Sequence, residues 1–432
     1  MDRRNYLCID AKSFYAAVEC LERGLDPMTT NLVVADPERS EKTICLAVSP
    51  SMKALGVRNR CRVFEIPNNI EYIMAPPSMQ KYIDYAAEIY GVYLRYLSKE
   101  DIYVYSIDEV FLDVTHYLPY YKLSAREMAQ RLMDEVQRDI GVRTTCGIGT
   151  NLYLAKIALD ITAKHSPDFI GELDEESYKK QLWDHKPITD FWRIGPGTAN
   201  RLAQYGITTM GQVAQADEDF LYRLFGVDAE LLIDHSYGRE IVTIQDIRRY
   251  KPKSNCLSSG QVLQRDYSFE EAELIVKEML DLMCLDLVGK GMVTGSITIQ
   301  IGYSNPANMA PAKGTAKLEL ETSADRVIIP AVVSLYRRIV ERDVPIRRIN
   351  ISFNKIVPEP SQTAVQLSLF DMESSVTNSE KLEKNKKIQE TMLKIKQRYG
   401  KNAILKGMNY QEAATTRERN RQIGGHKSGE QT

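Results

Sequence analysis

The sequence contains no apolar run of the roughly 18 residues that a membrane-spanning helix requires, so we expect no membrane span. We expect no signal peptide either, because the first residues lead directly into a strand-like segment. The seven cysteines are odd in number and include no C-x-x-C pair, which argues against a zinc site and a disulfide framework. These absences predict a protein of the reducing cytoplasm with free thiols in its core.

An excess of positive charge is also missing. The formal net charge is −2 over 432 residues, so the chain as a whole is not a basic nucleic-acid binder. The basic residues are clustered, however, and local patches determine where a polyanion binds. The clusters are Arg248, Arg249, Lys251 and Lys253, and Arg337, Arg338, Arg342, Arg347 and Arg348. The length and an apolar fraction of 44% indicate a globular protein of about two to four domains.

Two adjacent carboxylates, Asp108 and Glu109, interrupt a stretch of strand-like residues. Apolar residues alternate on both sides of the pair, from Ile102 to Val114, which predicts two half-buried strands that meet near the acids. Buried carboxylates are costly unless they are solvated or hold a cation, and Mg²⁺ takes one or two protein carboxylates together with substrate phosphates. Taken alone, the pair fits a turn with two solvated acids equally well.

A third carboxylate, Asp10, ends an apolar strand near the N-terminus, and a helical pattern follows it. Ligands of α/β sheets usually bind at the carboxyl ends of strands. Asp10, Asp108 and Glu109 could therefore converge to hold two cations, which two-metal sites place roughly 3.5–4 Å apart.

The segments Ile9–Ala16 and Tyr105–Glu109 resemble the two catalytic motifs of Y-family translesion DNA polymerases, with a closer similarity to the bacterial UmuC/ImpB/MucB branch. The resemblance runs from about residue 5 to about residue 357. It implies a low-fidelity, template-directed DNA polymerase of DNA repair and damage tolerance, acting on primer–template DNA and dNTPs in the cytoplasm at the nucleoid. The implied ligands of two Mg²⁺ ions are Asp10, Asp108, Glu109 and the carbonyl of Ala11.

The resemblance also implies contacts with the incoming nucleotide. Tyr15 occupies the position of the steric gate, an aromatic ring that excludes a sugar 2′-OH, and Phe14 precedes it in the same motif. Lys53 and Lys164 match family cations directed at the triphosphate, whose oxygens need donors. The chain departs from the family's pattern at Pro50, where some relatives carry Tyr, and at Leu152, where many carry Lys. No contact is carried over to these two positions.

The expected fold class is a multidomain α+β right-hand polymerase. Its expected parts are a ferredoxin-like palm at 1–22 and 76–172, fingers at 23–75, a helical thumb at 173–244, a linker at 245–256, a little finger at 257–357 and a tail at 358–432. In the thumb, Gly195 and Gly197 flank a proline in a pattern that resembles a helix-hairpin-helix. Glycines there let the backbone approach a DNA phosphate at a helix N-terminus, although a plain helical hairpin also fits the pattern.

The little-finger segment is predicted as β-α-β-β-α-β, with its second helix beginning near Pro330. Capping boxes are expected before two helices, at Ser124 with Glu127 and at Ser268 with Glu271. The last strand alternates apolar residues with polar and cationic ones, as a duplex-binding sheet would. The residues expected to meet DNA phosphates are Arg347, Arg348 and Lys355.

The tail contains a short apolar motif, Gln366-Leu367-Ser368-Leu369-Phe370, which resembles the pentapeptide by which bacterial polymerases bind the sliding clamp. Exposed apolar side chains in a polar tail are unusual unless they dock on a partner. Gln366, Leu367, Leu369 and Phe370 are the expected clamp contacts. A charged helix is expected at 380–400, and the composition from Arg417 to Thr432 predicts disorder.

Two other functions compete with the polymerase. A nucleotidyl cyclase also joins two carboxylates to a triphosphate, but it does not need the glycine hairpin or the basic last domain. A non-catalytic DNA-binding accessory protein would be expected to lack a carboxylate, yet all three are present. The need for an accessory subunit stays open at this stage.

Overall fold

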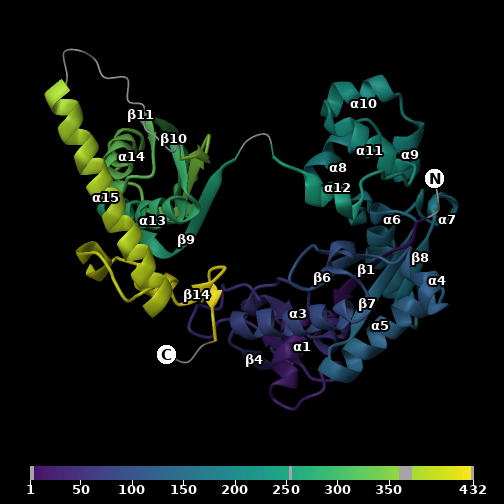
Figure 1. Cartoon of the computed structure of the whole chain (residues 1–432). Coiled ribbons are helices and arrows are strands. Elements are labelled where there is room, and N and C mark those ends of the chain that lie inside the picture. The colour runs from purple at the N-terminus through teal and green to yellow at the C-terminus, as the bar shows by residue number, and fades with distance from the viewer. Residues whose placement is uncertain (1–3, 253–254, 360–371, 430–432) are drawn as a thin grey trace. The chain divides into compact units, whose positions relative to one another are not determined.

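The computed structural model describes residues 4–252, 255–359 and 372–429. It contains two compact units (Figure 1), the first made of residues 1–250 and 426–432 and the second of residues 251–425. The boundary falls inside the expected linker, but the first part of that linker is the helix α12 (Ile244–Arg249), which belongs to the first unit. Thr243 caps α12, and Arg248 donates a hydrogen bond of 2.7 Å to the carbonyl of Ile102. The expected linker therefore begins too early.

A five-stranded sheet organises the first unit, in the order β5-β6-β1-β7-β8. Its strands are β1 (Tyr6–Ala11), β5 (Ile102–Val104), β6 (Glu109–Asp113), β7 (Thr144–Gly149) and β8 (Ile170–Leu173). The central strand β1 pairs antiparallel with both β6 and β7, while β8 is parallel to β7. Residues 6–9 of β1 are at most 1% exposed, because the protein covers both faces of the sheet.

One face of the sheet is covered by α6 (Leu152–Ile157), which continues through a π-helical turn, η3 (Ala158–Thr162). Two glycines of β7 let this helix lie directly on the strand. A Cβ at Gly147 would lie 2.1 Å from the carbonyl oxygen of Ala155, and one at Gly149 would lie 2.2 Å from its backbone nitrogen. Any side chain at either glycine would force the helix away from the sheet.

The helices α3 (Met79–Leu94) and α5 (Ala125–Ile140) pack against each other (Figure 1). Side chains of α3 share an apolar hollow of about 290 Å³ with Ile9 and Ala11, which point to the sheet face opposite α6. The predicted capping box of α5 is confirmed: Ser124 Oγ accepts from the Glu127 amide at 3.2 Å, and Glu127 Oε2 accepts from the Ser124 amide at 2.8 Å.

A small three-stranded sheet, in the order β3-β2-β4, lies between α1 and α3 in the sequence. Its elements are β2 (Leu32–Val34), β3 (Ala47–Val48) and β4 (Ile73–Ala75), and the neighbouring helices are α1 (Phe14–Leu21) and α2 (Pro50–Ala54). The residues from the end of β8 to Ser236 are largely helical: α7 (Glu175–Leu182), α8 (Pro196–Ala203), α9 (Met210–Gln215), α10 (Glu218–Phe225) and α11 (Asp228–Ser236). A shared apolar core, which includes Tyr178 and Leu202, holds these helices on α6.

The second unit has the predicted β-α-β-β-α-β order. The elements are β9 (Leu257–Tyr267), α13 (Phe269–Lys290), β10 (Met292–Tyr303), β11 (Ala312–Thr322), α14 (Asp325–Ile339) and β12 (Ile346–Asn354). The sheet order is β11-β10-β12-β9, and isoleucines of β10 and β12 pack with both helices in one core. The capping box of Ser268 and Glu271 is confirmed. The predicted start of α14 near Pro330 is wrong, because Pro330 lies inside the helix, exposed on its outer side.

The C-terminal segment is not the tail that its polar composition suggested. The helix α15 (Met372–Tyr399) packs on α13, and the residues after it satisfy buried carboxylates of that helix. Glu278 accepts hydrogen bonds of 2.8 Å from the side chain of Asn409 and the amide of Thr415, while Lys406 lies 2.5 Å from Asp281. The predicted helix at 380–400 is confirmed, but the predicted disorder after Arg417 is wrong for residues 417–429. The polar composition of this segment predicted that its side chains are exposed to solvent, whereas Lys406, Asn409 and Thr415 contact buried carboxylates of α13.

No helix in the described part of the chain is long and apolar enough to cross a membrane. The seven cysteines are all free, and all but Cys256 are buried, as the sequence predicted.

Candidate active site

The three predicted carboxylates lie on, or directly before, two adjacent strands. Asp10 at the end of β1 pairs in register with Glu109 at the start of β6, and the Ala11 amide donates a 2.9 Å hydrogen bond to the carbonyl of Asp108. Residues directly opposite each other on antiparallel strands have Cβ atoms roughly 4.5–5.5 Å apart, where like charges destabilise the pair. The sheet thus gathers negative charge in one place.

The pKa of Asp10 reflects both its burial and the nearby negative charges. Burial and the neighbouring charges of Asp108 and Glu109 raise the pKa of Asp10 to about 7. A carboxyl group with such a pKa holds a proton about half of the time at neutral pH unless a cation takes its place. The cluster is therefore suited to a hard cation with oxygen ligands. Within the described ranges, no group of three or more His, Cys, Asp and Glu side chains is placed so that it could hold a metal ion by itself.

Glu109 is held by two donors of the protein. Its Oε1 accepts from Cys8 Sγ at 3.2 Å, and its Oε2 accepts from Lys156 Nζ at 2.8 Å. Lys156 comes from α6, lies only 8% exposed and also contacts Asp160 at 3.0 Å. Burial lowers the pKa of Lys156, but the neighbouring carboxylates of Asp160 and Glu109 have a larger combined effect in the opposite direction. The pKa is therefore raised overall, and the side chain stays charged. Asp108 is oriented separately, by a 2.6 Å hydrogen bond from Ser106 Oγ.

Tyr15 lies beside the acids in the first turn of α1. Its ring stacks on Tyr82 of α3, with centroids 4.3 Å apart and planes 14° from parallel, and the Tyr82 hydroxyl donates to Glu19 at 2.6 Å. Burial and the negative charge of Asp108 raise the pKa of Tyr15. The ring is thus fixed by a second aromatic ring near a catalytic candidate. Phe14 is only 2% exposed, so its side chain belongs to the core and only its backbone can reach a nucleotide.

Three lysines lie near the acids. Lys53, on α2, donates to Ser13 Oγ at 2.8 Å, and Lys164 lies 3.9 Å from Asp160 after the π-helical turn. Lys12, which the sequence analysis did not select, lies 3.8 Å above the ring of Phe169. Burial and the nearby cations of Arg143 and Lys53 lower the pKa of Lys12, so a polyanion placed here would relieve a repulsion.

Comparison with known proteins identifies the family. The model of the impB/mucB/samB family matches residues 9–160, and the model of its C-terminal domain matches residues 255–369. The chain belongs to the impB/mucB/samB family. A protein named UvrX of Bacillus subtilis (strain 168), whose name refers to UV-damage repair, is 30% identical over 99% of this chain and 98% of its own length. DNA polymerase IV 2 of Halalkalibacterium halodurans is 29% identical over 97% of this chain and 98% of its own length.

Solved structures agree on the fold of this impB/mucB/samB family member. A chimeric Y-family DNA polymerase built from Dbh and Dpo4 matches with a TM-score of 0.64 at 18% identity, over 82% of this chain and 99% of that chain. A ternary complex of Dbh DNA polymerase matches with a TM-score of 0.50 over the same shares. The predicted fold class, a multidomain right-hand polymerase of mixed α and β structure, is confirmed.

The glycines predicted to meet DNA lie at the start of α8. Gly195 is the N-cap residue and Gly197 lies in the first turn, and a Cβ built at either glycine meets no atom within 4 Å. The protein therefore leaves their backbone accessible, together with the unpaired amides of a helix N-terminus. A short 3₁₀ turn, η5 (Ile188–Asp190), precedes α8 where a full helix of the hairpin was expected.

In the second unit, the face of the sheet that points away from the helices is polar. On β12, Ile349, Ile351 and Phe353 are buried, and Arg348 points to the opposite, exposed side. Arg347 lies at a register shift and pairs with Asp266 at 3.3 Å. Lys355 is exposed just after the strand. The sequence analysis missed two further exposed cations, Lys313 and Lys317 on β11. The alternation of lysines and other polar residues with small or apolar, half-buried neighbours along residues 312–318 was the signal that could have found them.

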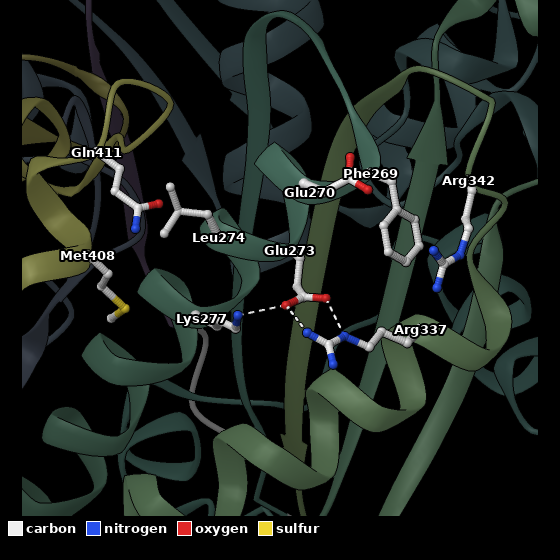
Figure 2. A pocket seen from close by; sticks show the side chains of 9 residues that line it. All are labelled: Phe269, Glu270, Glu273, Leu274, Lys277, Arg337, Arg342, Met408 and Gln411. Atoms are coloured by element: carbon white, nitrogen blue, oxygen red, sulfur yellow. Dashed lines mark hydrogen bonds and ion pairs between the residues drawn. The ribbon is translucent and has the colours of Figure 1, made fainter.

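A separate hollow of about 420 Å³ lies in the second unit (Figure 2). Figure 2 shows Glu273 between Lys277 and Arg337, which donate hydrogen bonds of 2.6–2.8 Å to its carboxylate. Arg337, above all, lowers the pKa of Glu273, so the acid stays ionised and paired. Arg342 lies 5.0 Å from the ring of Phe269. Because its central acid is neutralised by two cations, we do not select this hollow as the active site. The clamp motif, Gln366–Phe370, lies outside the described residues.

Proposed function

We propose that the carboxylate cluster on β1 and β6 is the active site of a template-directed DNA polymerase of the translesion type, which extends a primer 3′ end with dNTPs. The observation that carries this proposal is the register of Asp10 with Glu109, with Asp108 beside them. Acids that can hold cations lie next to lysines that can hold phosphates, which is the charge arrangement that a metal-bound triphosphate requires.

The donor set fits divalent metal ions. Burial, together with the negative charges of Asp108 and Glu109, raises the pKa of Asp10, and a bound cation would offset this effect. Carboxylate and carbonyl oxygens are the ligands that Mg²⁺ prefers. We assign Asp10, Asp108, Glu109 and the Ala11 carbonyl as ligands of two Mg²⁺ ions. When bound, such ions lower the pKa of an attacking hydroxyl and neutralise a leaving pyrophosphate. The protein's own part is to position the acids, to place Tyr15 beneath the sugar, and to direct Lys53 and Lys164 toward the triphosphate.

The remaining parts would hold the DNA. We assign the five-stranded sheet with its helices as the palm, residues 23–75 as the fingers, the helices from α7 to α11 as the thumb and the second unit as the little finger. The open backbone at Gly195 and Gly197 would contact phosphates, which positions a duplex without reading its bases. The polar sheet face of the second unit would meet the duplex backbone through its exposed cations.

Replacing Arg347, Arg348 and Lys355 together by Ala should weaken binding to all duplex sequences alike. Each lost phosphate contact should reduce the slope of log affinity against log salt concentration by roughly 0.9. Arg347 should contribute least, because it already pairs with Asp266. Fluorescence anisotropy across a salt series checks this, with Lys290→Ala as the control, since Lys290 lies at the end of α13 and pairs with Asp286. An unaltered slope in the triple variant would show that the sheet face does not meet DNA.

We also propose that Gln366–Phe370 docks on a bacterial sliding clamp, with Leu369 and Phe370 in an apolar pocket and with Gln366 and Leu367 at its edge. The chain on both sides of this segment, β13 (Val357–Pro358) and α15, belongs to the second unit. Leu369→Ala with Phe370→Ala should leave distributive extension of short primers intact. It should remove the stimulation that an added clamp gives on long, clamp-loaded templates, because tethering raises the local concentration of the enzyme at the primer end. Equal stimulation of both proteins would refute the motif.

The products separate this function from its rivals. With primer–template DNA, Mg²⁺ and dNTPs, a polymerase releases pyrophosphate only when the primer has a 3′-OH. A cyclase would release it from the nucleotide without DNA, and an accessory protein would release none. We expect pyrophosphate release that a dideoxy-terminated primer blocks. Release that is independent of the primer end would replace the polymerase assignment with a cyclase.

A further inference from the structure

Lys156 is a buried cation directly behind the carboxylate cluster. Its side chain is 10% exposed, and its Nζ lies 2.8 Å from Glu109 Oε2 and 3.0 Å from Asp160. The residues around it on α6 and η3, Leu152, Ala155 and Leu159, belong to an apolar core with Tyr6 and Cys8. An ammonium group in such surroundings loses much of its hydration, so an apolar side chain of the same length would be the cheaper choice for packing alone.

Lys156 reaches Glu109 because α6 lies directly on the sheet. The backbone of Ala155, the preceding residue, would be only 2.1–2.2 Å from a Cβ at Gly147 or Gly149. The glycines thus fix the height of the helix above β7, and the strand pairing fixes Glu109 opposite Asp10. The contact between Lys156 and Glu109 is therefore set by backbone packing on both sides.

The contact leaves the three acids unequal. Glu109 has one oxygen on Lys156 and the other on Cys8, so its orientation is fixed by the protein before any ligand arrives. Asp108 is fixed by Ser106 at its Oδ1, and the Ala11 amide contacts its carbonyl rather than its carboxylate. A divalent cation that uses Glu109 must share an oxygen with an ammonium group or displace it, whereas the same conflict does not arise for Asp108.

We infer that Lys156 is a positioning residue that competes with a divalent cation for Glu109 and so lowers the cation affinity of the free enzyme. This inference rests on the proposed metal-dependent function. Asp10 and Asp108 then form the stronger part of the site, and full engagement of Glu109 requires the charge of a bound triphosphate to draw in a second cation. Asp160 is the second partner of Lys156. Because Asp160 shares the ammonium group, it weakens the interaction between Lys156 and Glu109.

Equilibrium binding of Mn²⁺ to the full chain without DNA or nucleotide, followed by electron paramagnetic resonance, tests this inference. Lys156→Met should bind Mn²⁺ roughly tenfold more tightly, because one positive charge next to the site is removed at nearly constant volume. Lys156→Arg keeps the charge and should bind like the wild type. In primer extension, Lys156→Met should lose kcat rather than gain it, because Glu109 is no longer oriented, with little change in the KM for dNTP.

Asp160→Asn provides a second test at a more exposed side chain, in case Lys156→Met does not fold. It should weaken Mn²⁺ binding, because Glu109 then bears the whole ammonium charge. In the double variant with Lys156→Met, the Asp160 substitution should have almost no effect if it acts through the lysine. An unchanged Mn²⁺ affinity in Lys156→Met or in Asp160→Asn overturns the inference.

The control for the proposed function is Asp108→Asn, which should abolish Mn²⁺ binding. If the wild type and Asp108→Asn bind Mn²⁺ alike, the metal site itself is wrongly placed. If only the Lys156 and Asp160 variants fail to respond, the metal site stands and the competition by Lys156 is refuted.

Discussion

Asp108→Ala or Asp10→Ala should reduce primer extension by roughly a thousandfold or more, which corresponds to a loss of about 4 kcal/mol of transition-state stabilisation. The reason is that either change removes one of the proposed oxygen ligands from the carboxylate cluster of Asp10, Asp108 and Glu109. Single-turnover extension in Mg²⁺, with the enzyme in excess over the primer–template and the dNTPs saturating, measures this loss.

Binding of primer–template DNA should stay within about twofold of the wild type in both variants, because the helix α8 and the second unit would hold the duplex. The matched control is Asp113→Asn, since Asp113 lies on the same strand β6 but pairs with Arg4 at 3.3 Å, away from the cluster. Near-normal extension by Asp108→Ala, or an equal loss in Asp113→Asn, would remove the active-site assignment.

Tyr15→Ala should admit ribonucleotides. We expect the ratio of dNTP to rNTP incorporation efficiency to fall by roughly 100-fold, about 2.7 kcal/mol, because the ring that would collide with a 2′-OH is gone. The stacking of Tyr15 on Tyr82 at 4.3 Å supports this role, since a gate excludes an atom only if it cannot move aside.

The measurement is kcat/KM for dCTP and for CTP opposite a template dG. Tyr15→Phe retains the ring and should keep the wild-type ratio. A second variant, Tyr82→Leu, should lower the ratio partially by leaving the gate unsupported. An unchanged preference for dNTPs in Tyr15→Ala would place the gate elsewhere.

Much of the site could be predicted because its residues lie in short motifs. The alternation of apolar residues predicts the strands at whose ends Asp10 and Asp108–Glu109 lie. The register of β1 with β6 then brings these acids together. The capping boxes at Ser124 and Ser268 were predictable for the same reason, since both partners lie within one turn. These features depend on local sequence more than on contacts between distant segments.

Features that depend on long-range packing were missed. Lys156 looks like an ordinary helical lysine in the sequence, and only the close contact of α6 with β7 brings it to Glu109. Lys12 lies within the first motif, yet its place over Phe169 depends on the loop before β8. The side chain of Phe14 packs in the core, so the expected contact of this residue with the nucleotide can come only from its backbone.

The C-terminal segment shows the limit of composition as a guide. Its polar residues predicted a tail that is disordered after Arg417, but Arg419 donates to the side chain of Gln261 at 2.8 Å. Just before that point, Thr415 and Asn409 donate to the buried carboxylate of Glu278, which lies more than a hundred residues earlier. A buried acid of this kind makes polar residues the appropriate partners. No local pattern reveals such a match, because neither segment carries its partner in its own sequence.

The most direct test of the central claim is single-nucleotide incorporation by the wild-type chain on four primer–templates that differ only in the templating base, each with Mg²⁺ and one dNTP at a time. We expect every template to direct addition of its complementary dNTP to the primer 3′ end, and we expect Asp10→Ala to abolish all four additions. Incorporation that does not follow the template, or that persists in Asp10→Ala, would contradict the central claim.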